Sequence, residues 1–394
     1  MDSADGFRFA GVTCGIKESG NRDLAMIVSD RECVAAGVYT TNLVRAASID
    51  WNREITPTNL LRAVVINSGN ANACTGDSGI AANRHMAEET ARCLDSRPEQ
   101  VLVLSTGIIG EQLPMEKVTS GISHAVSELA TGSDAFNQAA NAILTTDKSA
   151  KTAAASYDSS GSLVSISGMC KGAGMIGPGM ATMLGVITTN ANLDEKSAHR
   201  FLSEAVDASF NRISVEGHMS TNDAVLLLAS GTGPVIAGEE STILFREHLK
   251  EVCVEMARMI PDDGEGASHL ISIRVSGCAN EADADLVARA IASSNLVKTA
   301  IHGADPNWGR IVSAAGYSCP DNLNPEEFGL MINGICVFRD GQPVGFDHSL
   351  ASRSIADNRE TVIEMTMGTG PGAAVHWTSD LTGDYVHFNS AYHT

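Results

Sequence analysis

The stretch that decides how this chain folds covers residues 171–190 and reads KGAGMIGPGMATMLGVITTN. It carries no charged residue after its first lysine, and at Ala181-Thr182 it changes from glycine-rich loop to an apolar run. Glycine and proline allow sharp bends, whereas a continuous apolar run is typical of a strand buried on both faces. The pattern predicts a bent loop that delivers Thr182 to the start of a rigid internal strand.

The glycines of this loop also match the dinucleotide-binding pattern G-x-G-x-x-G, as GAGMIG at 172–177. That pattern binds a pyrophosphate where a helix begins inside the glycines, so that the helix N-terminus meets the phosphates. Here a Gly-Pro-Gly sequence follows, and then the strand-like run MLGVITT. We therefore expect no nucleotide site in this loop.

The rest of the chain shows alternating helical and strand patterns. Apolar residues three and four positions apart predict helices at 80–94, 115–130, 134–144, 194–210, 241–260 and 281–294. Short runs rich in β-branched residues predict strands at 24–29, 63–68, 101–105, 162–167, 183–189, 224–230, 269–277 and 361–367. Their mixed order favours an α+β fold of stacked layers. The loop at 169–181 is the most visible seam between the two halves of the chain.

Charge and cysteine usage narrow the class of protein. The 394 residues carry a formal net charge of -20, which argues against partners such as nucleic acid or an anionic membrane surface. The nine cysteines form neither a C-x-x-C pair nor a zinc-type cluster, so we expect reduced thiols and no metal. The acidic N-terminus lacks the apolar segment of a secretory signal. These features predict a cytoplasmic protein.

Thr182 is the residue with the most interesting chemistry. A secondary alcohol becomes a useful nucleophile when an adjacent base takes its proton, and the α-amine of an N-terminal threonine can be that base. Such an amine has a pKa of about 8, against about 10.4 for a lysine side chain. Cleavage of the Ala181-Thr182 bond by the threonine hydroxyl would free it. From the residues alone, a purely structural threonine remains the alternative.

The quoted segment resembles the self-processing segment of the ornithine acetyltransferase (glutamate N-acetyltransferase) family, close to K-G-x-G-M-x-x-P-x-M-A-T-x-L. Seven further stretches match that family in order along nearly the whole chain. They are VINSGNANACTG (65–76), LSTGIIGEQLPME (104–116), ILTTD (143–147), STND (220–223), DGEGASH (263–269), LVKTAIHGADPNWGR (296–310) and YVHFNSAYHT (385–394).

The resemblance implies a layered α-β-β-α sandwich of the N-terminal-nucleophile aminopeptidase type, with a smaller C-terminal α/β portion. It also implies self-cleavage into fragments 1–181 and 182–394, which pack as one catalytic unit and associate as a heterotetramer. The implied reaction is ping-pong acetyl transfer from N2-acetyl-L-ornithine to L-glutamate in arginine biosynthesis, without a cofactor. Acetyl-CoA is a further possible donor.

The site residues also follow from the resemblance. Thr182 would be the nucleophile, with its freed amine as the base. Thr106 and Gly107 would form the oxyanion hole. The implied substrate contacts are Thr145, Lys171, Thr182, Glu265, Asn389 and Thr394. Lys171 suits an α-carboxylate and Glu265 suits a cationic amine.

Some positions depart from the family pattern, and two other functions stay open. Gly179 stands where an acid or asparagine is usual, and Glu216, His218 and Met219 replace common residues before the STND motif. These departures place substrate detail in doubt. The alternatives are a related self-processing amidohydrolase or aminopeptidase, in which water accepts the acyl group, and an unprocessed non-catalytic homologue.

Overall fold

The computed structural model describes residues 4–159, 161–177, 183–318 and 323–391. The chain forms two compact units, and the second contains the short segment Arg212–Gly217 and the segment Pro261–Tyr392. Both sides of the loop at 169–181 belong to the first unit, so the expectation that this loop is the main seam is wrong. The strands before and after the loop are hydrogen bonded to each other in one sheet.

The first unit contains an eight-stranded mixed sheet. Its strands are β1 (Phe7–Val12), β2 (Leu24–Tyr39), β3 (Thr58–Asn70), β4 (Val101–Ile108), β5 (Lys151–Ser159), β6 (Ser162–Lys171), β7 (Leu184–Thr189) and β9 (Ala224–Ala229). They are hydrogen bonded in the order β4-β3-β2-β9-β7-β6-β5, and β1 pairs with β2. Strand β7 begins two residues after Thr182, as the apolar run predicts.

The long strand β2 joins two layers of this sheet. Its first part pairs with β1 up to Ser29 and with β3 up to Val28, and its last part, from Val34 to Tyr39, pairs with β9. The pairing with β3 changes register between Val28 and Cys33, where the exposed sequence Asp-Arg-Glu lies. A register shift of this kind bends a strand, so β2 can pass from one layer to the other.

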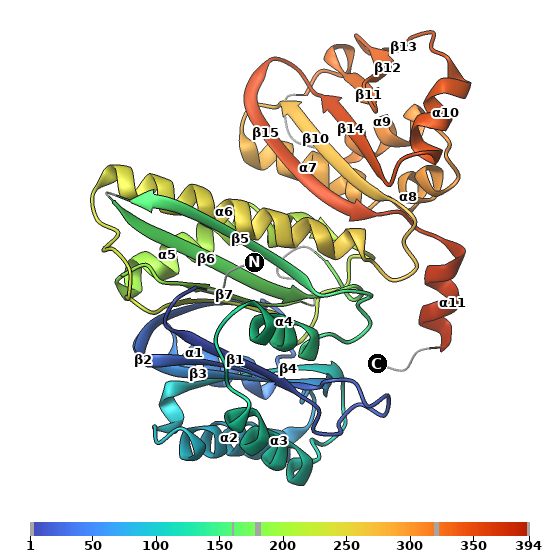
Figure 1. The fold of residues 1–394 in the computed structure, drawn as a ribbon. Coiled ribbons are helices and arrows are strands. Elements are labelled where there is room, and N and C mark those ends of the chain that lie inside the picture. Colours follow the sequence, from blue (N-terminus) through green and yellow to red (C-terminus); the bar gives the residue numbers. More distant parts are fainter. Residues whose placement is uncertain (1–3, 160, 178–182, 319–322, 392–394) are drawn as a thin grey trace. The chain divides into compact units, whose positions relative to one another are not determined.

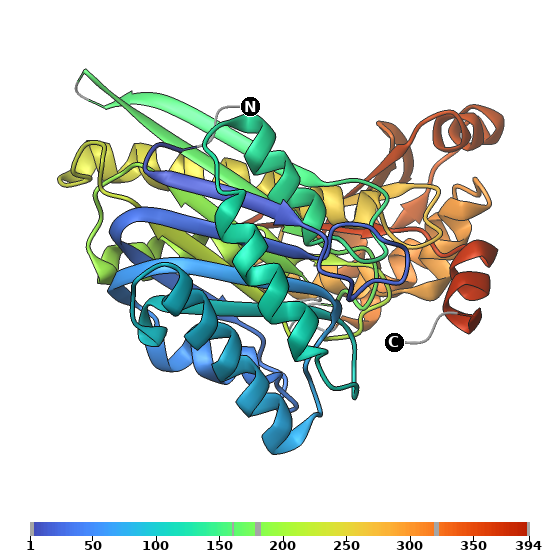
Figure 2. The ribbon, with the colours of Figure 1, turned by 60° about the horizontal axis from the view of Figure 1, so that its bottom comes forward.

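Helices cover both outer faces of these layers (Figures 1 and 2). The helices of the first unit are α1 (Ala47–Ile55), α2 (Gly76–Cys93), α3 (Met115–Ser127), α4 (Ser133–Ala142), α5 (Glu195–Asp207) and α6 (Glu239–Asp262), with 3-10 turns at Pro98–Gln100 and Phe210–Arg212. Met86 of α2 and Ile122 of α3 pack on Met26 and Val103. On the opposite side, Gly168 of β6 lies against Met256 of α6.

The inner core of the first unit fills the space between the two layers. Ile66 and Leu104 from one layer share a cluster with Leu184 and Leu226 from the other. Helices α1 and α4 contribute to the same cluster. Strands covered on both faces read as continuous apolar runs, which is why the sequence predicts them well. The α-β-β-α sandwich is therefore confirmed.

The second unit is smaller and has its own mixed sheet and core. Its strands are β8 (Ile213–Ser214), β10 (Leu270–Gly277), β11 (Gly329–Ile332), β12 (Ile335–Arg339), β13 (Gln342–Pro343), β14 (Glu360–Thr366) and β15 (Gly370–Ser379), in the order β13-β12-β11-β14-β10-β15-β8. Its helices are α7 (Glu281–Ala292), α8 (Asn295–His302), α9 (Trp308–Tyr317), α10 (His348–Ala356) and α11 (Gly383–Ala391), with a 3-10 turn at Pro325–Glu327. Its hydrophobic core includes Ile273, Val287, Ile311 and Ile363.

All six predicted helices and all eight predicted strands are present, with ends shifted by a few residues. The largest shift is at the strand expected at 24–29, which continues to Tyr39. The expected C-terminal α/β portion is the second unit. None of the helices in the described ranges is long and apolar enough to span a membrane.

Candidate active site

The site predicted around Thr182 is described through its neighbours. Ala181 and Thr182, and also Thr394, lie outside the described residues. The described chain resumes at Met183, whose carbonyl accepts a hydrogen bond from the Ala224 N–H at 3.1 Å. The site is therefore built from the residues around this end of β7.

The predicted oxyanion hole lies at the end of β4, where β3 and β4 run parallel. Thr106 is 3% exposed and pairs in register with Ser68, and Gly107 pairs with Gly69. Gly107 has a φ of +135°, and a Cβ there would overlap the Gly69 backbone. Glycine is required for this close approach and for this φ. The two glycines therefore let the ends of β3 and β4 approach each other closely.

The turn with the sequence STND is fixed to this strand end by one side chain. Asn222 is 4% exposed, and its Nδ2 donates to the Ser105 carbonyl at 2.8 Å and to the Ala71 carbonyl at 2.6 Å. Both carbonyls belong to segments that flank the glycine pair. The two amide hydrogens of Asn222 thus tie the residues before β9 to the candidate oxyanion hole.

Lys171, at the end of β6, contacts the same threonine. It is 3% exposed, and its Nζ donates to Thr106 Oγ1 at 3.4 Å. Because a hydroxyl that accepts a hydrogen bond keeps its own hydrogen for another acceptor, Thr106 remains able to donate. The predicted residues Lys171, Thr106 and Gly107 are therefore brought together.

Asp147 is the buried counter-ion of this region. Its side chain is fully buried, with Oδ1 2.7 Å from Lys151 Nζ and Oδ2 4.0 Å from Lys171 Nζ. Its carboxylate also accepts the Gly172 N–H at 2.6 Å and the Thr145 N–H at 3.2 Å. Burial opposes ionisation, but the charges of Lys171 and Lys151 and these hydrogen bonds outweigh it and lower the pKa of Asp147 to about 2. Thr145 thus lies beside this ion cluster.

A third lysine lies near the glycine pair. A Cβ built on Gly69 would come within 3.2 Å of Lys17 Cγ, so the Lys17 stem lies over this residue. Burial lowers the pKa of Lys17 to about 8; Asp23 opposes that shift and the positive charge of Lys171 adds to it. The Asp23 carboxylate holds this loop by accepting four consecutive N–H groups, from Cys14 to Lys17. The region is locally cationic.

The second unit brings together the other predicted substrate contacts. Asn389 in α11 donates through Nδ2 to Glu265 Oε2 at 3.1 Å. Burial and then the charges of Glu216 and Glu265 raise the pKa of Tyr385 to about 12. Glu216, one of the departures from the family pattern, is therefore a neighbour of this pair. The predicted role of Asn389 requires an ordered C-terminal segment, and α11 supplies that order up to Ala391.

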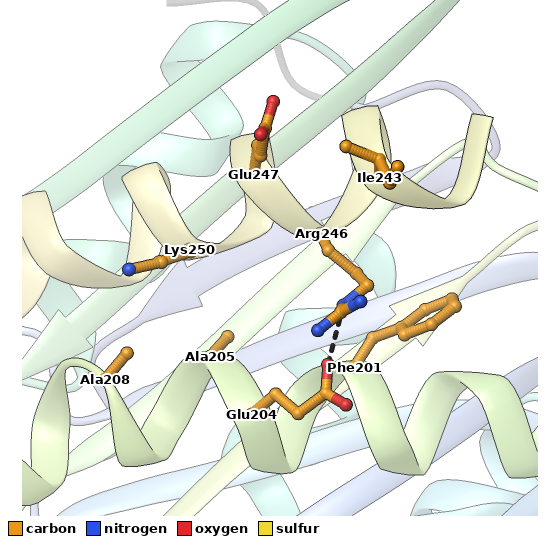
Figure 3. A pocket seen from close by; sticks show the side chains of 8 residues that line it. All are labelled: Phe201, Glu204, Ala205, Ala208, Ile243, Arg246, Glu247 and Lys250. Atoms are coloured by element: carbon orange, nitrogen blue, oxygen red, sulfur yellow. Dashed lines mark ion pairs between the residues drawn. The ribbon is translucent and has the colours of Figure 1, made fainter. Parts of the chain in front are cut away.

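A surface pocket elsewhere contains none of the predicted site residues. It has a volume of about 320 Å³ and lies between α5 and α6 (Figure 3). Two of its charged groups form an ion pair, because Arg246 Nε is 2.7 Å from Glu204 Oε2. Nor does any group of three or more His, Cys, Asp or Glu side chains within the described ranges have a metal-binding arrangement.

Sequence reasoning missed the ion cluster around Asp147 and the loop of Lys17. Asp147 is the last residue of the matched motif ILTTD, so that motif was the available signal. Lys151 follows four residues later, within a strand that the apolar pattern does not reveal. For Lys17 there was no local signal, because its proximity to Gly69 depends on how the 14–17 loop folds over β3.

The chain is similar to known proteins over nearly its whole length. The model of the ArgJ family matches residues 8–394. "Arginine biosynthesis bifunctional protein ArgJ" of Rhodopirellula baltica is 46% identical over 393 residues, covering 99% of this chain and 96% of that protein. A protein of the same description from Symbiobacterium thermophilum is 44% identical over 394 residues, covering 99% and 97%. A crystal structure of argJ from Bacillus halodurans has a TM-score of 0.50 and 38% identity, covering 52% of this chain and 97% of that one.

Proposed function

Because the chain belongs to the ArgJ family, we propose that it is an acyltransferase of arginine biosynthesis that moves the acetyl group of N2-acetyl-L-ornithine to L-glutamate. The observation that carries this proposal is the buried contact between Lys171 and Thr106, beside the Gly107 turn and at the entrance to the loop that holds Thr182. The proposed acceptor of the acetyl group is the Thr182 hydroxyl. The reaction needs no cofactor.

The proposed first step is self-cleavage. The Thr182 hydroxyl attacks the carbonyl carbon of Ala181, the peptide C–N bond breaks, and water hydrolyses the resulting ester. The products are the Ala181 carboxylate and a free α-amine on Thr182, so the fragments are 1–181 and 182–394. Support comes from the Bacillus halodurans structure. The matching chain there is aligned over 97% of its own length but covers only 52% of this chain, as expected for one fragment of a cleaved protein.

Acetyl transfer then proceeds in two halves. The freed amine of Thr182 takes the hydroxyl proton as Oγ attacks the acetyl carbonyl. The oxyanion is stabilised by the Thr106 hydroxyl and the Gly107 N–H, a type of interaction worth about 3 kcal/mol for each donor. The same proton goes to the departing α-nitrogen of ornithine. The α-amine of glutamate reverses these steps and leaves as N-acetylglutamate.

The charges of the described residues fit these substrates. The cationic region of Lys171 and Lys17 suits the α-carboxylate that both substrates carry. The Glu265 carboxylate, held by Asn389, suits the cationic side-chain amine of ornithine. We further propose a heterotetramer of two copies of each fragment, and acetyl-CoA as a second donor, in keeping with the word bifunctional in the names of the relatives.

Denaturing electrophoresis tests the self-cleavage step. The unaltered chain should give two bands whose termini are Ala181 and Thr182, whereas Thr182→Ala should stay whole and lose acetyl transfer. Thr182→Ser should cleave partly, because it keeps the hydroxyl. An active protein with an intact bond between residues 181 and 182 would overturn the proposal.

A transfer assay tests the substrates. Glutamate is offered with N2-acetylornithine or with acetyl-CoA, and N-acetylglutamate and acetate are both measured. We expect N-acetylglutamate from the acetylornithine reaction. Release of acetate in the absence of glutamate would instead support the hydrolase alternative, and an uncleaved, inactive chain would support the non-catalytic one.

A further inference from the structure

A second buried acid, Asp223, lies beside the first described residue after the predicted cleavage position. The parallel strands β7 and β9 are in register from Leu184 and Ala224 onward. The preceding residues, Met183 and Asp223, are therefore neighbours. The Met183 N–H donates to Asp223 Oδ1 at 3.1 Å. That N–H belongs to the peptide bond between residues 182 and 183.

The surroundings of Asp223 differ from those of Asp147. Asp223 is 0% exposed, and its Oδ2 is buried with no hydrogen-bond partner in the described part of the chain. Asp147 has two ammonium groups within 4.0 Å. Burial with one N–H hydrogen bond, to Oδ1, disfavours a charged carboxylate more strongly than a neutral carboxylic acid.

The electrostatics of Asp223 agree with this geometry. Burial raises the pKa of the Asp223 carboxyl well above its usual range. The Met183 N–H, the nearby hydroxyls of Thr40 and Ser220, and the charge of Lys171 oppose that shift without cancelling it. Met183 lies directly before β7, Thr40 directly after β2, Ser220 in the turn before β9, and Lys171 at the end of β6.

We propose that Asp223 is a positioning residue of self-cleavage and acetyl transfer, which holds the start of β7 through the Met183 N–H while it carries no charge. The inference rests on the proposed function, because it concerns the reactions of the residue that precedes Met183. Its role is to fix the backbone next to the nucleophile without adding a negative charge there.

The absence of a charge matters for the base. An α-amine with a pKa of about 8 is already mostly protonated at neutral pH. A carboxylate at a distance of a few ångströms stabilises an ammonium ion and raises its pKa by about 1–3. The amine would then be a poor base. A neutral acid accepts the same backbone hydrogen bond and leaves the amine free to accept a proton.

Two substitutions separate this role from that of a simple packing residue. Asp223→Asn keeps the shape, the absence of charge and an oxygen that accepts the Met183 N–H. Asp223→Ala removes the acceptor. We expect Asp223→Asn to stay within about tenfold of the unaltered chain in both self-cleavage and acetyl transfer, and Asp223→Ala to lose at least about a hundredfold. The acid limb of the pH profile of kcat/KM should shift by less than about half a pH unit in Asp223→Asn.

A different pair of results would overturn the inference. If Asp223 is ionised in the native protein, Asp223→Asn removes a negative charge, and the acid limb should move down by about one pH unit or more. If Asp223 has no positioning role, Asp223→Ala should cleave and transfer like the unaltered chain.

A measurement without catalysis keeps the inference apart from the proposed function. In a Thr182→Ala background, where the chain stays whole, the free energy of unfolding is compared with and without Asp223→Asn between pH 4 and pH 7. A carboxyl whose pKa is raised by folding stabilises the protein below its unfolded pKa, and that stabilisation is lost as pH rises. We expect the chain that retains Asp223 to lose stability, relative to the chain with Asp223→Asn, as pH rises. The opposite slope would contradict a neutral Asp223, whether or not acetyl transfer is found.

Discussion

The acid Asp147 has a different function from Asp223, because it neutralises two lysines that would otherwise be buried charges. Lys151 is 1% exposed and Lys171 is 3% exposed. Removing one member of such a cluster leaves uncompensated charge, which costs about 3–5 kcal/mol. Asp147 therefore supports the candidate site through Lys171, the residue that contacts Thr106.

Asp147→Asn should lower the free energy of unfolding by about 3–5 kcal/mol at neutral pH. The pH dependence should change as well. The folded pKa of about 2 lies below the reference value of 3.8, so the unfolded chain binds more protons in acid. The resulting stabilisation, about 2 kcal/mol, is present above pH 4 and is lost as pH falls to 2.

Urea unfolding of Asp147→Asn should therefore show a flatter decline between pH 4 and pH 2 than the unaltered chain. The exposed residue Asp134 provides the matched control, and Asp134→Asn should change stability by no more than about 0.5 kcal/mol. Equal curves for Asp147→Asn and Asp134→Asn would show that the ion cluster does not stabilise the fold.

Thr106 provides a prediction for catalysis. Thr106→Val keeps the shape but removes the hydroxyl donor, so kcat should fall by about 10²–10³ with a smaller change in KM. Thr106→Ser keeps the donor and should retain most of the activity. Steady-state kinetics of both variants, with melting temperatures to confirm folding, give the comparison. Equal losses in the two variants would argue against an oxyanion role for the hydroxyl.

At the scale of elements, the turn at the end of β4 depends on two glycines that face each other. Gly107→Ala should disrupt this turn, because the new Cβ would overlap the Gly69 backbone. Gly110→Ala is the matched control. Gly110 has a φ of +86° and nothing within 4 Å of its would-be Cβ, so it tests the backbone cost alone, about 1 kcal/mol.

Thermal unfolding separates the two glycine variants. Gly107→Ala should lower the melting temperature clearly more than Gly110→Ala and should lose acetyl transfer as well. If both variants melt at the same temperature, the close approach of β3 and β4 is not required for the fold.

The same scale shows what the sequence could and could not predict. Strands such as β7 and β9, buried on both faces, were predicted because every residue in them is apolar or small. Strand β5 was missed because it alternates buried and exposed positions in a polar sequence, KTAAASYDS. Helix α11 was missed because none of its residues is buried, so it has no apolar stripe.

The candidate site shows the same division. The family resemblance predicted Thr106, Gly107, Lys171, Glu265 and Asn389, since each lies in a matched motif. The ion pair of Lys151 and the position of the Lys17 loop depend on how the folded chain packs together. The sequence near these residues therefore gives no signal for them. The contact between Asp223 and Met183 depends on the register of two strands that are forty residues apart in the chain.

For the whole molecule, the predicted cleavage position determines which strands belong to which fragment. The proposed break falls within the first unit, whereas the chain passes into the second unit at Arg212–Gly217 and again after Ile260. Strands β7 and β9 would belong to the second fragment. They pair with each other and are inserted between β2 and β6, which would belong to the first.

The fragments should therefore stay together after cleavage. Strand β9 pairs with β2 over Val34–Tyr39, and β7 pairs with β6 over Ile166–Lys171. On size-exclusion chromatography without denaturant, both fragments should elute in one peak, and they should separate only in denaturant. Spontaneous separation in native buffer would contradict the interleaved sheet.

The interleaved strands also limit refolding once the chain has been cleaved. A continuous chain brings β6 and β7 together as neighbours, at the modest entropic cost of closing one short loop. Once severed, the two pieces must find each other by diffusion and thread a strand pair into a gap. Recovery from denaturation would then depend on concentration and compete with aggregation. The cleaved protein would persist because it unfolds slowly. A copy that did unfold would not regain the native structure efficiently.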